Sequence, residues 1–202
     1  GMSSSWTLTA LPLFVWMGEI LFRTKLSENL FEGLSPWMQK LPGGLIHVNV
    51  VGCAIFAAIS GSSAATVATV GKMSIPELRK RNYPEKILLG SLAGSGTLGL
   101  LIPPSIILII YGVTVQESIA KLFIAGIFPG IMIAIIFMTY VVIWSLMNKN
   151  KMPVLTEEIP FIEKIKKSGK LIPVILLIVS VIGSIYSGVA TATEAASLGV
   201  VG

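Results

Sequence analysis

Two stretches of small polar residues and glycines interrupt otherwise apolar parts of the sequence, and they hold the groups best able to do chemistry. The first runs from Ile59 to Thr66 around Ser60-Gly61-Ser62-Ser63, and the second runs from Gly94 to Ser105 and contains Pro103-Pro104. Hydroxyl oxygens and the free carbonyls at the ends of broken helices are hard ligands suited to a small monovalent cation such as Na⁺. Helix amino ends suit a carboxylate instead.

A simpler interpretation of either stretch is helix packing, because small residues let two backbones approach closely. A Pro-Pro pair can likewise be a plain kink. However, the two prolines remove two backbone donors and disfavour helix before them, so a chain break is expected at Ile102. Two polar stretches at two expected breaks, separated by one basic loop, favour a binding site over packing alone.

The composition indicates the kind of protein that must position these stretches. Of the 202 residues 53% are apolar and 12% are charged, with a formal net charge of +5, whereas soluble domains are about 45–50% apolar and about 25% charged. A soluble domain and a disordered chain are both disfavoured. A single His47 excludes a multi-histidine metal site and a single Cys53 excludes an internal disulfide. Because basic residues lie in short loops between apolar runs, an all-α integral membrane protein is expected, and nucleic-acid binding is not.

The apolar runs and loops divide the chain into seven segments. The first combines the end of a transmembrane helix with an amphipathic interfacial segment, and two later segments are interrupted by the polar stretches. The expected segments are 1–43 (helix end and amphipathic segment), 44–71 (re-entrant hairpin), 72–86 (basic cytoplasmic loop), 87–115 (broken transmembrane helix), 116–147 (transmembrane helix), 148–170 (cytoplasmic loop) and 171–202 (transmembrane helix and the segment after it).

The distribution of Lys and Arg favours a re-entrant 44–71 segment over a full crossing. A full crossing places four basic residues on one side and eleven on the other, whereas a re-entrant segment places fourteen on one side and one on the other. Both arrangements obey the positive-inside rule, and the re-entrant one obeys it better. Irregular backbone at membrane depth must be buried in protein or line a wet cavity. The two interrupted segments are therefore expected to face each other.

Six blocks of sequence, in this order, resemble the large membrane subunit of tripartite ATP-independent periplasmic (TRAP) transporters. The resemblance covers essentially the whole chain, and the order of the blocks makes it specific. Two departures from the family pattern are Ala192, where many members have Pro, and Thr66, at or near which many have Asp. The blocks are Gly43–Val50, Ile59–Thr66, Gly96–Ser105, Tyr111-Gly112, Leu122–Gly130 and Gly188–Ala196.

The resemblance implies an elevator-type transporter with inverted repeats, in which this partial chain holds most of the first repeat and the start of the second. It implies Na⁺-driven import of an organic acid, such as a C4-dicarboxylate or sialic acid, across the bacterial inner membrane by a multi-pass protein. It also implies a periplasmic substrate-binding protein and a small membrane subunit as partners, next to membrane lipid. No cofactor beyond the coupling Na⁺ and no enzymatic activity are expected.

Carried over by position, the resemblance implies a Na⁺ site between the two polar stretches, with substrate bound beside it. The first stretch supplies hydroxyl and carbonyl oxygens, and the second supplies unwound backbone. The Na⁺ residues are Ser60, Gly61, Ser62, Ser63, Gly96, Thr97 and Gly99, and the substrate residues are Ser62, Ser63, Pro103, Pro104 and Ser105.

Four other polar or reactive residues receive structural interpretations. His47 is expected to be a satisfied structural residue, and Cys53 a small buried hydrophobe. Glu19 is expected to pair with Arg23 four residues later, and Glu194 to stabilise a helix amino end.

Three rival functions explain less of the sequence. A channel needs a continuous polar path, and a membrane-embedded enzyme would have to use Glu and one His without any Asp. A purely structural membrane subunit accounts for the helices but gives neither interrupted segment a reason.

Overall fold

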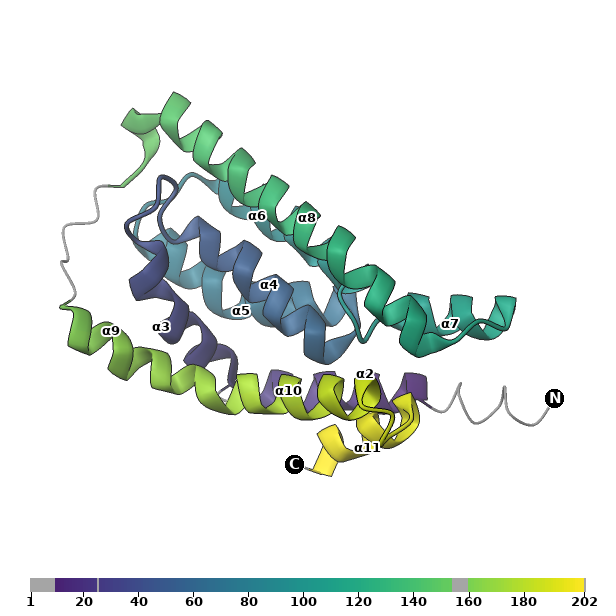
Figure 1. Cartoon of the computed structure of the whole chain (residues 1–202). Coiled ribbons are helices and arrows are strands. Elements are labelled where there is room, and N and C mark those ends of the chain that lie inside the picture. The colour runs from purple at the N-terminus through teal and green to yellow at the C-terminus, as the bar shows by residue number, and fades with distance from the viewer. Residues whose placement is uncertain (1–9, 25, 154–159, 202) are drawn as a thin grey trace.

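A computed structural model describes residues 10–24, 26–153 and 160–201, and every regular element in these ranges is a helix. Ten are α-helices and three are short 3₁₀ turns (Figure 1). In chain order they are α2 (Ala10–Arg23), α3 (Leu26–Met38), α4 (Ile46–Ser60), α5 (Ser63–Lys80), α6 (Glu85–Gly96), η1 (Thr97–Leu100), α7 (Ile106–Val115), α8 (Ile119–Met147), η2 (Lys149–Lys151), α9 (Phe161–Ser168), η3 (Gly169–Leu171), α10 (Ile172–Tyr186) and α11 (Ala192–Val201).

Helices α4 and α5 form a hairpin that reverses at Gly61 and Ser62. Gly61 adopts the left-handed conformation with φ 59° and donates its N–H to the Ala57 carbonyl, which ends α4. Ser62 is the N-cap of α5, and its hydroxyl accepts from the Ala65 N–H at 3.4 Å. A left-handed glycine after a helix and a serine N-cap are common helix-end signals. The reversal therefore falls within the first polar stretch.

The second arm of this hairpin is longer than the sequence predicts. Residues 72–80 were expected to begin a loop, yet α5 continues to Lys80 with Pro76 inside it. Val70, Ser74 and Leu78 are each at most 1% exposed and recur every four residues. This spacing puts them on one helix face, so packing against the bundle holds α5 helical through the proline.

The second interrupted segment breaks as expected. Helix α6 ends at Gly96, the 3₁₀ turn η1 follows, and regular helix resumes only at Ile106. The Ser105 hydroxyl donates to the Leu100 carbonyl at 2.7 Å and spans the break. The peptide bond between Pro103 and Pro104, which lie inside the break, is cis.

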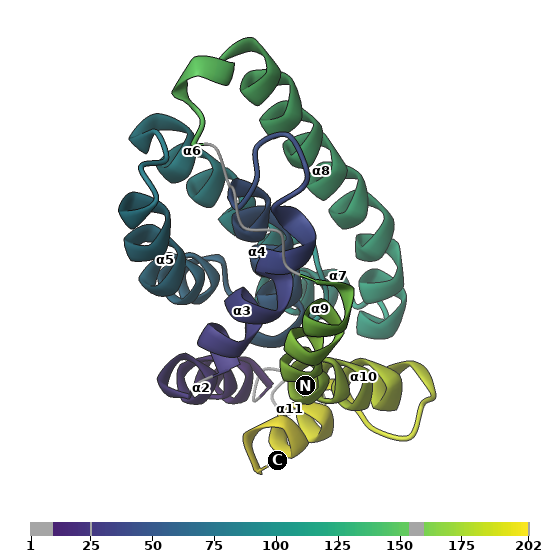
Figure 2. The same cartoon turned by 90° about the vertical axis from the view of Figure 1, so that its left-hand side faces the viewer.

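Two helical segments are long and apolar enough to cross a membrane, namely Ile119–Met147 and Phe161–Tyr186. Only 17% of the most apolar window of each is buried. They lie on different sides of the α4–α5 hairpin, with α8 above it and α10 below it in Figure 1; Figure 2 gives the view at 90°. The expected loop 148–170 is partly helical, because α9 runs through η3 into α10 and packs along α3.

The contact between α3 and the second span explains why this span begins at Phe161, inside the expected loop. The Trp37 indole N–H donates to the Ser168 hydroxyl at 2.7 Å, and its ring meets Phe161 edge-on with centroids 6.4 Å apart. Lys170 forms an ion pair with Glu32. These contacts join helices more than 120 residues apart in the chain, so local sequence periodicity could not reveal them.

Helix α2 covers the hairpin tip from one side and also packs against α11. Phe14 and Met17 are fully buried, and a Cβ on Gly18 would lie 3.1 Å from Ser60 Cβ. The Arg23 guanidinium contacts the Glu19 carboxylate at 2.9 Å, which confirms the expected ion pair.

Substituting Gly126 tests the packing of α8 on the break. A Cβ there would lie 2.6 Å from the Leu101 carbonyl oxygen, which is backbone and cannot turn aside. We expect Gly126→Ala to destabilise the fold by about 1–3 kcal/mol through overpacking. The matched control is Gly90→Ala, also within a helix, where a Cβ meets nothing within 4 Å. The control should be neutral or stabilising by about 0.5–1 kcal/mol. Thermal unfolding in detergent measures both, and equal midpoints for the two variants would contradict this packing.

Candidate functional site

The hairpin tip and the helix break are joined directly through their backbones, so the two interrupted segments face each other as expected. The Ile106 N–H donates to the Gly61 carbonyl oxygen at 3.2 Å. A Cβ on Gly61 would lie 2.5 Å from the Pro104 carbonyl oxygen. Since only glycine has no Cβ and also adopts a positive φ easily, Gly61 meets two requirements at once.

Glycines on the other side of the break allow a second close approach. A Cβ on Gly99 would lie 2.9 Å from the Ser63 nitrogen and 3.1 Å from the Ser62 carbonyl carbon. A Cβ on Gly96 would overlap with Val67 Cγ2. The 3₁₀ turn η1 therefore rests on the first turn of α5. Of the predicted ion-site residues, the structure thus brings Gly96 and Gly99 against the hairpin.

Four helix ends meet at this junction. Helix α4 ends at Ser60 and α6 ends at Gly96, while α5 begins at Ser63 and α7 begins at Ile106. Helix carboxyl ends carry free carbonyls with partial negative charge, and amino ends carry free N–H groups with partial positive charge. The junction can therefore offer oxygens to a cation and amides to an anionic group within a short distance of each other.

The predicted hydroxyls differ in how they are engaged. Ser60 is fully buried, and its Oγ lies 2.9 Å from Thr66 Oγ1 and 3.3 Å from the Ser62 carbonyl oxygen. Thr66 is also fully buried and was not among the predicted ligands. Its signal in the sequence was its place in the first polar stretch, one turn after Ser62.

Ser63 carries the hydroxyl that is most available to a ligand. Its Oγ is buried, and no hydrogen-bond partner is found for it among the described residues. Buried hydroxyls are nearly always hydrogen-bonded, so the Ser63 hydroxyl has capacity left for a ligand or for water, as do the hydroxyls of Thr69 and Ser74 further along α5. Thr97, by contrast, is exposed and its hydroxyl donates to the Gly94 carbonyl at 2.7 Å. Thr97 can therefore contribute its backbone more readily than its side chain.

Carboxylates and imidazoles do not build this site. In the described ranges no three His, Cys, Asp or Glu side chains lie together in a group able to hold a metal ion. The oxygens at the junction are hydroxyl and backbone oxygens, which suit a monovalent cation better than a transition metal.

Two of the remaining polar residues have the structural roles that were expected of them, and His47 has its role in part. His47 is fully buried and its Nε2 lies 2.8 Å from the Pro42 carbonyl oxygen, but its Nδ1 is buried without a partner among the described residues, so the ring is only half satisfied. Cys53 is buried among apolar residues. The Thr191 N–H donates to a Glu194 carboxylate oxygen at 2.7 Å and the Glu194 N–H donates to the Thr191 hydroxyl at 3.4 Å, which forms a capping box on α11.

Substituting Gly61 tests the junction. Gly61→Ala and its control Gly188→Ala both place a side chain at positive φ, at a cost of about 1–2 kcal/mol. Only at Gly61 would the added Cβ also meet backbone, since a Cβ on Gly188 meets nothing within 4 Å. We expect Gly61→Ala to break the hydrogen bond from the Ile106 N–H to the Gly61 carbonyl oxygen, so that hydrogen exchange over residues 101–110 accelerates. Unchanged protection there in Gly61→Ala, or equal acceleration in Gly188→Ala, would contradict this contact.

Comparison with known proteins shows which family this chain resembles. A family profile described as "Tripartite ATP-independent periplasmic transporter, DctM component" matches residues 1–202. The chain is 37% identical over 199 residues to a C4-dicarboxylate TRAP transporter large permease protein of Pseudomonas aeruginosa, covering 98% of this chain and 46% of the relative.

Two further relatives carry other substrate names. Identity is 36% over 197 residues to an isethionate TRAP transporter permease protein of Oleidesulfovibrio alaskensis, covering 96% of this chain and 30% of the relative. It is also 36% over 198 residues to a 2,3-diketo-L-gulonate TRAP transporter large permease protein of Escherichia coli, covering 97% and 45%. The chain thus spans about half the length of these relatives, or less.

Proposed function

Because the chain belongs to the DctM component family of tripartite ATP-independent periplasmic transporters, we propose that it is part of a permease that imports an organic acid by Na⁺-coupled secondary transport. The junction between the hairpin tip and the helix break carries this proposal. It joins the carboxyl ends of two helices and the amino ends of two others at one place. Broken helices that meet in this way are the usual ion and substrate sites of secondary transporters.

In this proposal Na⁺ binds between residues 60–63 and 96–99. The Ser63 hydroxyl, which is buried without a partner among the described residues, is the leading side-chain ligand. Carbonyls from the end of α4 and from η1 complete the oxygen shell. Gly61 and Gly99 let the two backbones come close enough for one ion to reach both.

The substrate carboxylate binds next to the ion, at the amino ends of α5 and α7. Ser62 and Ser105 are the N-caps of these two helices, and Pro103 and Pro104 hold the chain between the helix ends. A bound cation and two helix amino ends both favour a negative group, so Na⁺ and carboxylate stabilise each other there. This mutual stabilisation is the physical basis of the proposed symport.

The substrate is proposed to be a C4-dicarboxylate, with sialic acid as a second candidate. The relative at 37% identity and two further relatives are named for C4-dicarboxylate, whereas others are named for ectoine, isethionate and 2,3-diketo-L-gulonate. The proposed partners are a small membrane subunit and a periplasmic substrate-binding protein, and the proposed location is the bacterial inner membrane.

An elevator movement is consistent with the packing. The hairpin and the break are locked together through backbone contacts that leave no room for a Cβ at Gly61 or Gly99. The two candidate spans keep most of their surface exposed. We therefore propose that the junction moves as one body relative to other parts of the transporter.

Uptake into proteoliposomes tests this function. The full-length permease containing this chain is reconstituted with its small subunit and binding protein, and radiolabelled carboxylates are offered with and without an inward Na⁺ gradient. We expect C4-dicarboxylate uptake that requires both the gradient and the binding protein. Flux that ignores the gradient would contradict symport and support a channel.

The Na⁺ site itself is tested by Ser63→Ala. Removing the unpartnered hydroxyl should raise the half-saturating Na⁺ concentration about tenfold, which corresponds to about 1.4 kcal/mol of ion binding. The matched control is Ser74→Ala, since Ser74 is also on α5 and also has a buried hydroxyl without a partner among the described residues, but lies three turns from the tip. An equal effect of both substitutions, or no effect of Ser63→Ala, would argue against this ligand.

A further inference from the structure

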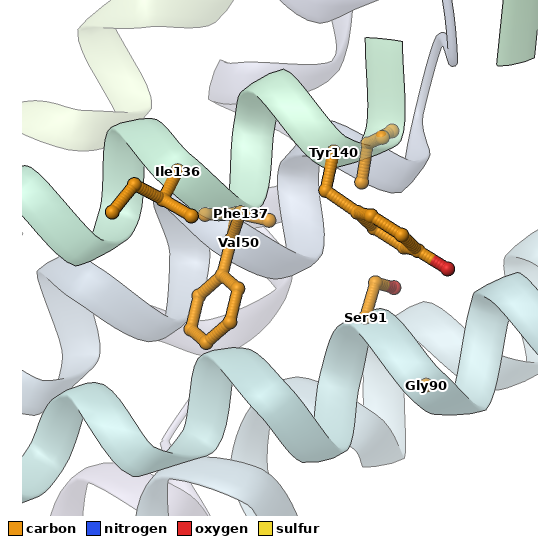
Figure 3. A pocket seen from close by; sticks show the side chains of 7 residues that line it. Val50, Gly90, Ser91, Ile136, Phe137 and Tyr140 are labelled. Carbon is orange, nitrogen blue, oxygen red and sulfur yellow. The ribbon is translucent and has the colours of Figure 1, made fainter. Parts of the chain in front are cut away.

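A cavity of about 300 Å³ lies between α4, α6 and α8, away from the hairpin junction (Figure 3). Val50 lines it from α4, Gly90 and Ser91 from α6, and Phe137 and Tyr140 from α8. A Cβ on Gly90 would meet nothing within 4 Å, so the absent side chain leaves part of this space open. This volume is at the lower end of the range for small-molecule sites.

The lining suits an apolar ligand with its few polar atoms at one end. In Figure 3 the hydroxyls of Ser91 and Tyr140 lie toward the Gly90 end, whereas Phe137 lies at the other. The Ser91 hydroxyl already donates to the Leu88 carbonyl at 3.0 Å and accepts from the Asn49 side-chain amide at 3.0 Å. The Ser91 hydroxyl is therefore already engaged, and the rest of the lining is mostly apolar, so burial of hydrocarbon must supply most of the binding.

The cavity borders a helix face that is exposed along a candidate membrane span. On α8, Ile136 is 54% exposed and Ile143 is 52% exposed. In a family of membrane permeases this surface contacts hydrocarbon chains. Lipid is therefore the apolar molecule with direct access to the cavity.

The register of α6 and α8 places basic residues at the polar end of the cavity. Gly94 lies against Phe137, while Gly90 lines the cavity together with Tyr140, so the two helices run antiparallel. The start of α6 and the end of α8 are therefore at the same end of the cavity, with Lys86 about one turn before Gly90 and Lys149 about two and a half turns after Tyr140. Lys86 stands at the start of α6, and Lys149 follows the end of α8.

These lysines are available to an anionic group. Both are exposed, and no ion pair is found for either within the described ranges. The neighbouring carboxylate, Glu85, is engaged by Arg79 through bonds of 2.6 and 3.2 Å. Lys151, also at this end, donates to the Asn148 side-chain oxygen at 3.0 Å. Basic residues at a membrane surface attract anionic headgroups.

We propose that this cavity binds one acyl chain of an anionic phospholipid, whose phosphate is held by Lys86 and Lys149. The chain lies along Gly90 and Phe137, and the ester region lies near the hydroxyls of Ser91 and Tyr140. A lipid bound there separates the exposed span α8 from α6, the helix that leads into the break. This inference rests on membership of a membrane permease family and not on Na⁺ coupling or on a particular substrate.

Native mass spectrometry of the detergent-purified permease complex, titrated with phosphatidylglycerol, tests the cavity. We expect a saturable adduct of one lipid per permease chain that survives delipidation. Gly90→Phe fills the open space and should weaken this adduct at least tenfold. The matched control is Gly183→Phe on α10, where a Cβ also meets nothing within 4 Å, and it should leave the adduct unchanged.

A smaller substitution, Gly90→Leu, guards against misfolding, and thermal unfolding confirms that each variant is folded. Absence of the adduct in the wild-type complex, or equal occupancy in folded Gly90→Phe or Gly90→Leu, would overturn the proposal. Either result leaves Na⁺-dependent uptake unaffected as a separate measurement.

The headgroup is tested by replacing both lysines. Lys86→Gln with Lys149→Gln should reduce the preference for phosphatidylglycerol over phosphatidylcholine several-fold. The control is Lys121→Gln, at the opposite end of α8. An unchanged preference in the double variant, or the absence of any preference in the wild type, would refute the anionic headgroup contact.

Discussion

The close backbone contact between the hairpin tip and the helix break is the constraint on which the arrangement of the junction depends. The Ile106 N–H reaches the Gly61 carbonyl, and the Pro104 carbonyl lies where a Gly61 side chain would begin. Gly99 meets the start of α5 in the same way. Non-helical backbone inside a membrane must find its hydrogen-bond partners within the protein. Each interrupted segment supplies part of what the other needs, so neither is expected to keep this geometry alone.

The same contact concentrates charge without using charged side chains. Two helix carboxyl ends and two amino ends are brought together, and serine and threonine hydroxyls lie among them. Partial charges from helix ends are held in place by packing and need no deprotonation. This explains how a chain without any aspartate could bind a cation and a carboxylate side by side.

Away from this junction, the exposed spans and the cavity between α4, α6 and α8 form a second, apolar level of organisation. Helix α8 contacts the hairpin and the break, while the span formed by α9 and α10 contacts α3. Tyr140 and Phe137 belong both to the exposed span and to the cavity beside α6. The exposed span and the helices that lead to the junction therefore meet at one small, mostly apolar cavity.

The sequence by itself determined the helical membrane class, the position of the break and the residues of the reversal. Each depends on local chemistry: apolar run length, the missing N–H groups of Pro103 and Pro104, and the absent Cβ of Gly61.

Only the tertiary structure decided how far the helices extend and which hydroxyls remain free. Helix α5 continues past Pro76 because Ser74 and Leu78 pack into the bundle. Helix α9 forms where its residues contact Trp37 on α3. The hydroxyl of Thr66 hydrogen-bonds to that of Ser60, and the hydroxyl of Thr97 donates to the Gly94 carbonyl. The Ser63 hydroxyl is left without a partner among the described residues. These outcomes depend on contacts between segments distant in sequence or across a turn, whose geometry local periodicity does not encode.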